Sequence, residues 1–420
     1  MSAHIKVLSQ SATLAMAQKI NEFKAKGIDI VNFCVGEPDF NTPEHIKKAA
    51  EKAINDNWTK YTPVPGLPTL REAICGKLRR ENGLEYQPQE ILVSNGAKQS
   101  VCNAIMSLVG PGDEVVIPAP YYVSYPQMVN LAGGINVYVN ASIENGFRVT
   151  PEQLEQAITP KTKLVIICTP NNPTGVVYTR KELEGMAEVI LRYENIFVIS
   201  DEIYEHLNYV GEHTSMASIP GMRERTIVVN GVSKSYAMTG WRIGFIAAPK
   251  WIVDACNVLQ GQYTGNPCSV SQKAAEEAWN GEQGSVEEMR QVFQKRRDLM
   301  VQLVREIPGL EVYEPEGAFY VFPKCNTYFG KTYNGKTINS SADLTMFLLE
   351  EGHVAAVSGD AFGAPGYIRL SYATSEERII EGLRRIKESL ILYFIYEYYY
   401  ICHHSNESNQ LCGVYINHRR

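Results

Sequence analysis

Residues 233–244 have the sequence Ser-Lys-Ser-Tyr-Ala-Met-Thr-Gly-Trp-Arg-Ile-Gly, and they follow the apolar run Thr-Ile-Val-Val at 226–229, which predicts a buried strand. In this position Lys234 can form a Schiff base with an aldehyde, and Arg242 can bind a phosphate through its planar fork of donors. Pyridoxal 5′-phosphate (PLP) is a cofactor that carries both groups. A lone lysine is usually a solvated surface charge, so this prediction depends on partners elsewhere in the chain.

Two upstream apolar runs end in polar residues that suit such a cofactor. Residues 164–168 predict a buried strand, and the turn formers Thr-Pro-Asn-Asn-Pro-Thr-Gly follow at 169–175. Residues 196–200 predict another strand, which ends at Asp201. Loops at strand ends are where α/β enzymes bind ligands, and a carboxylate there can pair with a protonated ring nitrogen. Taken alone, the first loop could be an ordinary turn and Asp201 a helix N-cap.

The apolar runs alternate with helical stretches, which is the pattern of a mainly parallel sheet. The runs of the larger unit are 91–93, 114–117, 164–167, 196–199, 227–229 and 243–246. Two further strands, at 319–322 and 367–371, are predicted for a smaller α+β unit. We therefore predict an α/β fold divided into an N-terminal arm with part of the small domain (1–41), a large domain (42–284), a small C-terminal domain (285–390) and an atypical tail (391–420).

Three motifs together resemble the fold-type I, PLP-dependent class I/II aminotransferases in order and spacing. They are Asn-Asn-Pro-Thr-Gly at 171–175, Ser-Asp-Glu-Ile-Tyr at 200–204 and Ser-Lys-x5-Gly-x-Arg-x-Gly at 233–244. The stretches 61–63, 94–99 and 118–126 resemble more closely the aspartate/prephenate aminotransferases of bacteria and plastids. The resemblance implies a ping-pong aminotransferase that acts between aspartate or glutamate and a 2-oxo acid, and it leaves prephenate open as an acceptor.

The resemblance also implies a cofactor site. Lys234 would hold PLP and move the proton, Asp201 would pair with the ring nitrogen, and Tyr204 and Asn172 would hydrogen-bond the ring O3′. Tyr122 stands where this subgroup usually has a tryptophan stacked on the ring, and a tyrosine can also stack. The phosphate would be bound by backbone N–H groups at a helix start and by nearby side chains. These phosphate residues are Gly96, Ala97, Lys98, Ser233, Arg242 and, from the neighbouring subunit of a homodimer, Tyr61.

Substrate contacts follow from the same resemblance. Arg369 would bind the substrate α-carboxylate in a bidentate fork with help from Asn172, and Gly36 would let the backbone approach that carboxylate. Lys98 and Thr13 would receive the side-chain carboxylate, which favours a dicarboxylic amino donor. Alternatively, Arg369 could form a surface ion pair, and the side chain of Lys98 could be solvated.

The composition narrows the class of protein. A chain of 420 residues with 45% apolar and 20% charged residues is typical of a soluble protein with two domains. Its net charge of −6 argues against a nucleic-acid or anionic-membrane partner. The nine cysteines and eight histidines lack metal-ligand spacing, so no metal site and a reducing compartment are predicted. The family-like arm begins almost at Met1, which leaves no room for a signal or transit peptide and predicts a cytoplasmic protein.

The family pattern stops near residue 390. The next ten residues, Ile-Leu-Tyr-Phe-Ile-Tyr-Glu-Tyr-Tyr-Tyr, lack the basic residues of an anchoring helix, so an unstructured or loosely docked appendage is favoured over a membrane-surface anchor. Two other functions are kept as alternatives. A PLP-dependent β-lyase shares the fold and the proton chemistry. A non-catalytic PLP-binding module is disfavoured because no basic helix-turn-helix segment precedes the fold.

Overall fold

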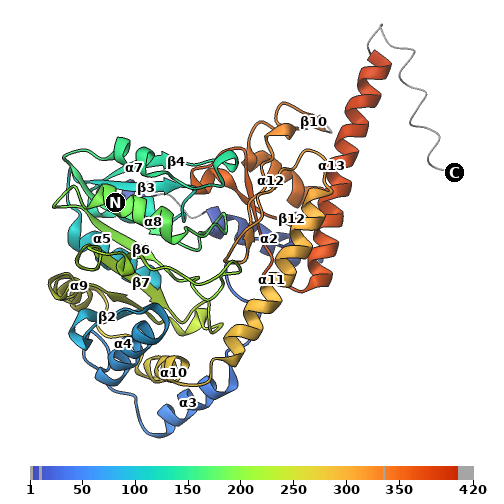
Figure 1. The fold of residues 1–420 in the computed structure, drawn as a ribbon. Coiled ribbons are helices and arrows are strands. Elements are labelled where there is room, and N and C mark those ends of the chain that lie inside the picture. The colour runs from blue at the N-terminus through green and yellow to red at the C-terminus, as the bar shows by residue number, and fades with distance from the viewer. Residues whose placement is uncertain (1–2, 9–11, 334–335, 405–420) are drawn as a thin grey trace.

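The computed structural model describes residues 3–8, 12–333 and 336–404, and its central element is a seven-stranded sheet (Figure 1). Four neighbouring pairs of strands are parallel, and β8 alone runs antiparallel to its two neighbours. The strands, in spatial order, are β2 (Ile91–Ser94), β8 (Gly244–Ala247), β7 (Thr226–Gly231), β6 (Phe197–Asp201), β5 (Thr162–Cys168), β3 (Glu114–Ala119) and β4 (Ile135–Asn140). The predicted mainly parallel sheet is confirmed.

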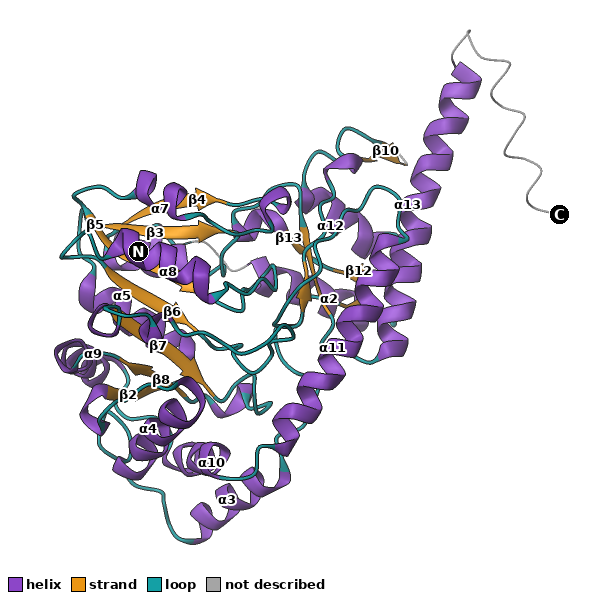
Figure 2. Ribbon diagram, in the orientation of Figure 1, coloured by secondary structure: helices purple, strands orange, loops and turns teal. Residues whose placement is uncertain are grey.

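Helices cover both faces of this sheet, as Figure 2 shows. Because successive side chains of a strand point to opposite faces, Leu164 and Ile166 of β5 join a core with α5, α6 and α9, whereas Val165 and Ile167 join another with α7 and α8. The helices of this unit are α3 (Glu44–Asn55), α4 (Pro68–Asn82), α5 (Ala97–Leu108), α6 (Tyr125–Ala132), α7 (Pro151–Ala157), α8 (Arg180–Ile190), α9 (Lys250–Tyr263) and α10 (Ser269–Asn280). The continuous apolar runs of β5 and its neighbours are thus explained by burial on two sides.

A smaller unit is built from both ends of the chain. β1 (Val31–Asn32) pairs in parallel with β12 (Val354–Ala355), and β13 (Val357–Ser358), β14 (Ile368–Ser371) and β9 (Tyr320–Val321) form an antiparallel sheet. The remaining elements are α1 (Ala3–Lys6), α2 (Ala12–Ala25), α11 (Gly284–Arg305), β10 (Thr332–Tyr333), β11 (Lys336–Thr337), α12 (Ser341–Glu350) and α13 (Glu376–His404). The domain boundaries near residues 41, 284 and 390 stay predictions.

The first part of the tail, residues 391–404, is helical rather than unstructured, and its loose docking stays a prediction. Helix α13 continues through the tyrosine-rich run to His404, and Figure 1 shows its end extending beyond the rest of the described chain. No glycine or proline interrupts residues 391–400, so no residue in that run breaks the helix. The tail beyond residue 404 lies outside the described residues. No helix in the described part of the chain is both long and apolar enough to cross a membrane.

Candidate active site

A cavity of about 260 Å³ lies where the loops after β5, β6 and β7 meet the start of α5 and the small unit. Eleven of the fourteen predicted site residues line it, although they come from seven separate stretches of the chain. These eleven are Gly36, Ala97, Lys98, Tyr122, Asn172, Asp201, Tyr204, Ser233, Lys234, Arg242 and Arg369. The structure therefore brings most of the predicted residues to one place.

Lys234 stands in the loop after β7 and is half-buried. Its Nζ donates a hydrogen bond to the carbonyl oxygen of Gly36 at 2.6 Å. Desolvation in the cavity lowers the pKa of Lys234 to about 8, with the charge of Glu37 acting in the opposite direction. A lowered pKa makes the neutral, nucleophilic amine more available near neutral pH.

Asp201 ends β6 and is buried. The Tyr125 hydroxyl donates to Asp201 Oδ2 at 2.6 Å, and the Ile203 N–H donates to Oδ1 at 3.3 Å. Burial raises the pKa of Asp201 to about 6, because these hydrogen bonds offset only part of the cost of desolvating the carboxylate. Among the described residues, Asp201 thus has neutral hydrogen-bond donors but no cation in contact, which fits a cationic ligand group. The sequence analysis missed Tyr125.

The start of α5 forms one end of the cavity. Gly96 has φ +84°, and a Cβ there would lie 2.4 Å from Arg242 Nη2, so the close approach of the guanidinium requires glycine. Arg242 donates to the carbonyl oxygens of Thr239 at 2.8 Å and Asn95 at 3.3 Å. A helix N-terminus beside a guanidinium is suited to an anion such as a phosphate group.

Arg369 on β14 forms the opposite end and is 4% exposed, so the alternative of a surface ion pair is wrong. It donates to Asn172 Oδ1 at 3.0 Å and to the Cys34 carbonyl oxygen at 2.9 Å. Its Nε is buried and has no hydrogen-bond partner in the part of the chain that the structure describes, and its guanidinium lies 4.3 Å from the centroid of the Tyr320 ring. No carboxylate contacts Arg369 within the described residues, which leaves the guanidinium with capacity to bind one.

Three predicted residues need separate comment. Tyr61 is 97% exposed on this single chain, far more than the other exposed large apolar and aromatic residues. Lys98 is exposed at the wall of the cavity, with its Nζ 6.0 Å from the centroid of the Tyr122 ring. Thr13 falls in the first turn of α2, and its side chain lies outside the described part of the structure.

Tyr204 and Tyr320 form a second contact that the sequence analysis missed. Their hydroxyl oxygens lie 3.0 Å apart across 116 residues of sequence, and both side chains are buried. Tyr204 belongs to the loop after β6 and Tyr320 to β9 of the small unit. The pair therefore joins the two units at the cavity wall.

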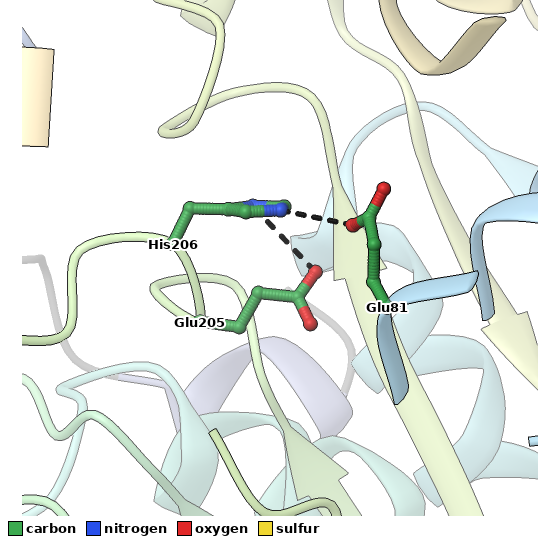
Figure 3. A group of neighbouring side chains, drawn as sticks. All are labelled: Glu81, Glu205 and His206. Atoms are coloured by element: carbon green, nitrogen blue, oxygen red, sulfur yellow. Dashed lines mark hydrogen bonds and ion pairs between the residues drawn. The ribbon is translucent and has the colours of Figure 1, made fainter. Parts of the chain in front are cut away.

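A polar network lies behind the cavity, where Glu81, Glu205 and His206 come together (Figure 3). Their carboxylate and imidazole atoms are close enough to hold a cation, although the sequence predicted no metal site. However, Glu205 already forms a buried ion pair with Lys77 and accepts hydrogen bonds from Asn230 and Asn82. A metal ion would have to displace the ammonium group of Lys77, so we assign none.

Comparison with known proteins identifies the family. The model of the family described as aminotransferase class I and II matches residues 28–386. The chain belongs to this family. It is therefore an aminotransferase, and the predicted resemblance is confirmed.

This chain is similar to known proteins over almost its whole length. It is 49% identical over 391 residues to a probable aspartate/prephenate aminotransferase of Rickettsia bellii, covering 92% of this chain and 98% of that one. It is 48% identical over 380 residues to an aspartate/prephenate aminotransferase of Cereibacter sphaeroides, covering 90% and 95%. Two similar structures are the Rhizobium meliloti aspartate aminotransferase (TM-score 0.90, 43% identity, 93% and 98% covered) and the Thermus thermophilus enzyme with maleate (TM-score 0.87, 41% identity, 93% and 99% covered).

Proposed function

We propose that this aminotransferase uses PLP to move an amino group between aspartate or glutamate and a 2-oxo acid. The observation that carries the proposal is the cavity itself, which places an amine of lowered pKa, a carboxylate without a cationic partner and a guanidinium with a free donor around one space. The names of the similar enzymes support a dicarboxylic substrate, and one of them was crystallised with the dicarboxylate maleate.

The residues present fit PLP. The phosphate would be held by the N–H groups of Gly96, Ala97 and Lys98 and by Arg242, with Ser233 beside them; Gly96 provides the space that any side chain would fill. Asp201 would pair with the ring nitrogen, Tyr204 and Asn172 with O3′, and Tyr122 would stack on the ring. When bound, the cofactor supplies an electron sink that stabilises negative charge on the substrate α-carbon.

The protein's own groups would then act as follows. Arg369, with Asn172 and the backbone at Gly36, orients the substrate α-carboxylate. Lys234 would hold the cofactor, and its Nζ would move the proton at the substrate α-carbon. The first oxo acid leaves before the second one binds, so the two half-reactions follow a ping-pong order.

A panel of substrates tests this function. Aspartate, glutamate and alanine would each be assayed as donors with 2-oxoglutarate, oxaloacetate and prephenate as acceptors. We expect aspartate and glutamate to exceed alanine, and parallel lines in double-reciprocal plots. Release of ammonia from an amino acid with a leaving group on Cβ, without amino transfer, would contradict the proposal and support the β-lyase alternative.

We also propose a homodimer in which Tyr61 reaches the phosphate of the neighbouring subunit. Its exposed fraction of 97% supports this, because a phenol ring with almost no contact on its own chain can be packed by a partner. Sedimentation at assay concentration should show a dimer. An active monomer would contradict the assignment of Tyr61.

A further inference from the structure

His206 joins the loop that carries Lys234 to helix α4. Its Nδ1 lies 2.8 Å from Ser235 Oγ, and its Nε2 lies 3.0 Å from Glu81 Oε2 on α4. Ser235 directly follows Lys234 and is 1% exposed, and His206 is the partner of its hydroxyl group. The His206 ring also packs edge-to-face on Tyr236, at 6.2 Å between centroids. His206 thus contacts both residues that follow the lysine.

Glu81 determines which nitrogen of His206 carries the proton. Burial would raise the pKa of Glu81, but the hydrogen bond from His206 and the charge of Lys77 outweigh it and lower the pKa overall. An ionised carboxylate only accepts hydrogen bonds, so Nε2 of His206 must be the donor. In the neutral ring Nδ1 is then an acceptor, and the Ser235 hydroxyl donates to it.

Glu81 and the backbone of His206 are held in place by buried charges. Lys77 forms an ion pair with Glu205, the residue before His206, and lies 3.5 Å from Glu81 Oε2. Glu205 in turn accepts from Asn230 Nδ2 at 2.7 Å, near the end of β7. Glu205 Oε1 itself lies 3.7 Å from Nδ1 of His206, too far for a hydrogen bond. Of Lys77, Glu81, Glu205 and His206, only His206 therefore forms a hydrogen bond with Ser235.

We propose that His206 is a positioning residue for Lys234: oriented by Glu81, its ring fixes Ser235 and with it the backbone from which the lysine extends. The proposal rests on the proposed function of Lys234 for its catalytic consequence, but not for its structural one. His206 does not line the cavity, so it acts through Ser235 rather than on the substrate.

Amide hydrogen exchange tests the structural part without any cofactor. The Tyr236 N–H donates to the Val232 carbonyl oxygen at 3.2 Å, and the Met238 N–H donates to that of Ser233 at 3.2 Å, so both amides report on the loop. Exchange would be compared between purified wild-type and variant proteins without added PLP. His206→Ala and Ser235→Ala should each speed exchange at these two amides by about tenfold, and the double variant should do no more than either single one.

A matched control separates positioning from general destabilisation. Thr226 lies at the opposite end of β7, is buried and donates one hydrogen bond to the Met222 carbonyl oxygen at 2.8 Å. Thr226→Val should therefore lower the midpoint of thermal unfolding to a similar degree while leaving the exchange at Tyr236 and Met238 unchanged. His206→Asn, whose amide can take the place of Nδ1, should recover part of the protection. Glu81→Gln, which frees the choice of tautomer, should lose part of it.

Kinetics test the catalytic part. His206→Ala should lower kcat for aspartate by roughly tenfold, because a small displacement of a reacting group is costly, with KM changed less than twofold. The proposal is overturned if His206→Ala and Thr226→Val have the same effects on exchange and kcat, or if the effects of His206→Ala and Ser235→Ala add. If the wild-type protein transferred no amino group, the proposed function would fail, while the exchange experiment would still decide the role of His206.

Discussion

Asp201 and Glu205 are buried carboxylates four residues apart on one segment, and their surroundings shift their pKa values in opposite directions. Burial raises the pKa of Asp201 to about 6, with hydrogen bonds from Tyr125 and Ile203 as the main opposition. Burial acts in the same direction on Glu205, but the charge of Lys77 and the hydrogen bond that it donates outweigh this effect and lower the pKa of Glu205. The charge of Glu205 is balanced by Lys77, so we interpret Glu205 as structural. Asp201 has no cationic partner among the residues that the structure describes, which suits a cationic ligand.

The largest effect should come from Lys234, which lines the cavity together with Asp201. Lys234→Ala removes the residue proposed as covalent anchor and proton carrier, so turnover should fall by roughly 10⁴-fold or more. The visible absorbance of the lysine-bound cofactor should vanish, and borohydride should no longer fix the cofactor to the chain. Full activity of this variant would remove the basis of the proposed function.

Glu205 does not line the cavity, so Glu205→Gln should mainly lower the free energy of unfolding. It removes the nearest and most buried counter-charge of Lys77 and leaves only Glu81 at 3.5 Å, which costs up to about 3–5 kcal/mol of unfolding free energy. Urea denaturation followed by circular dichroism would measure the loss. Adding Lys77→Met should restore part of the stability. An unchanged urea midpoint in the single variant would show that the pair contributes nothing.

In contrast to Glu205→Gln, Asp201→Asn should raise the free energy of unfolding. The folded-state pKa of Asp201 lies above its ordinary value, so the wild-type protein loses stability as the pH rises from about 4 to about 6. The amide avoids this cost, and without cofactor the variant should be more stable than the wild type by about 3 kcal/mol at pH 7.5, with roughly half that gain at pH 5. Turnover should fall severely, because a neutral amide cannot hold the ring nitrogen protonated. Equal stability at both pH values would contradict the assigned pKa.

The smallest effect concerns substrate specificity. Lys98→Ala should lower kcat/KM for aspartate by roughly ten- to a hundredfold, since a hydrogen bond to a charged group contributes about 1.5–3 kcal/mol. Alanine, which has no distal carboxylate, should be affected much less. Equal losses for the two donors would mean that Lys98 contributes only through its backbone.

Local sequence patterns correctly predicted the strands that carry Asp201 and Lys234. Each of the six apolar runs of the larger unit forms a strand, and Asp201 and Lys234 follow two of these runs. The positions of such residues can be predicted because the carboxyl ends of parallel strands lie at the same edge of the sheet. β4 was missed because it is an edge strand with little burial, and Ile135 and Tyr138 remain exposed. Its sequence therefore lacks the continuous apolar run of the buried strands.

Contacts between distant segments could not be predicted in the same way. Tyr125 meets Asp201 across 76 residues, and Lys77 meets Glu205 across 128. No local pattern marks such pairs, because each partner is an ordinary helical or loop residue until the fold brings them together. The helical course of α13 beyond residue 390 is not indicated by the family pattern, which ends there, and only the absence of helix breakers favours it.

The two ends of the cavity also differ in the order in which a ribosome would deliver them. Gly96, Asp201, Lys234 and Arg242 are all encoded before Arg369, which follows Arg242 by 127 residues and depends on a sheet of C-terminal strands. At about 5–20 residues per second, roughly 6–25 seconds of synthesis separate the two ends. A growing chain thus acquires the groups suited to a phosphate and a cationic ring well before it can grip a carboxylate, so cofactor capture could precede substrate recognition during biosynthesis.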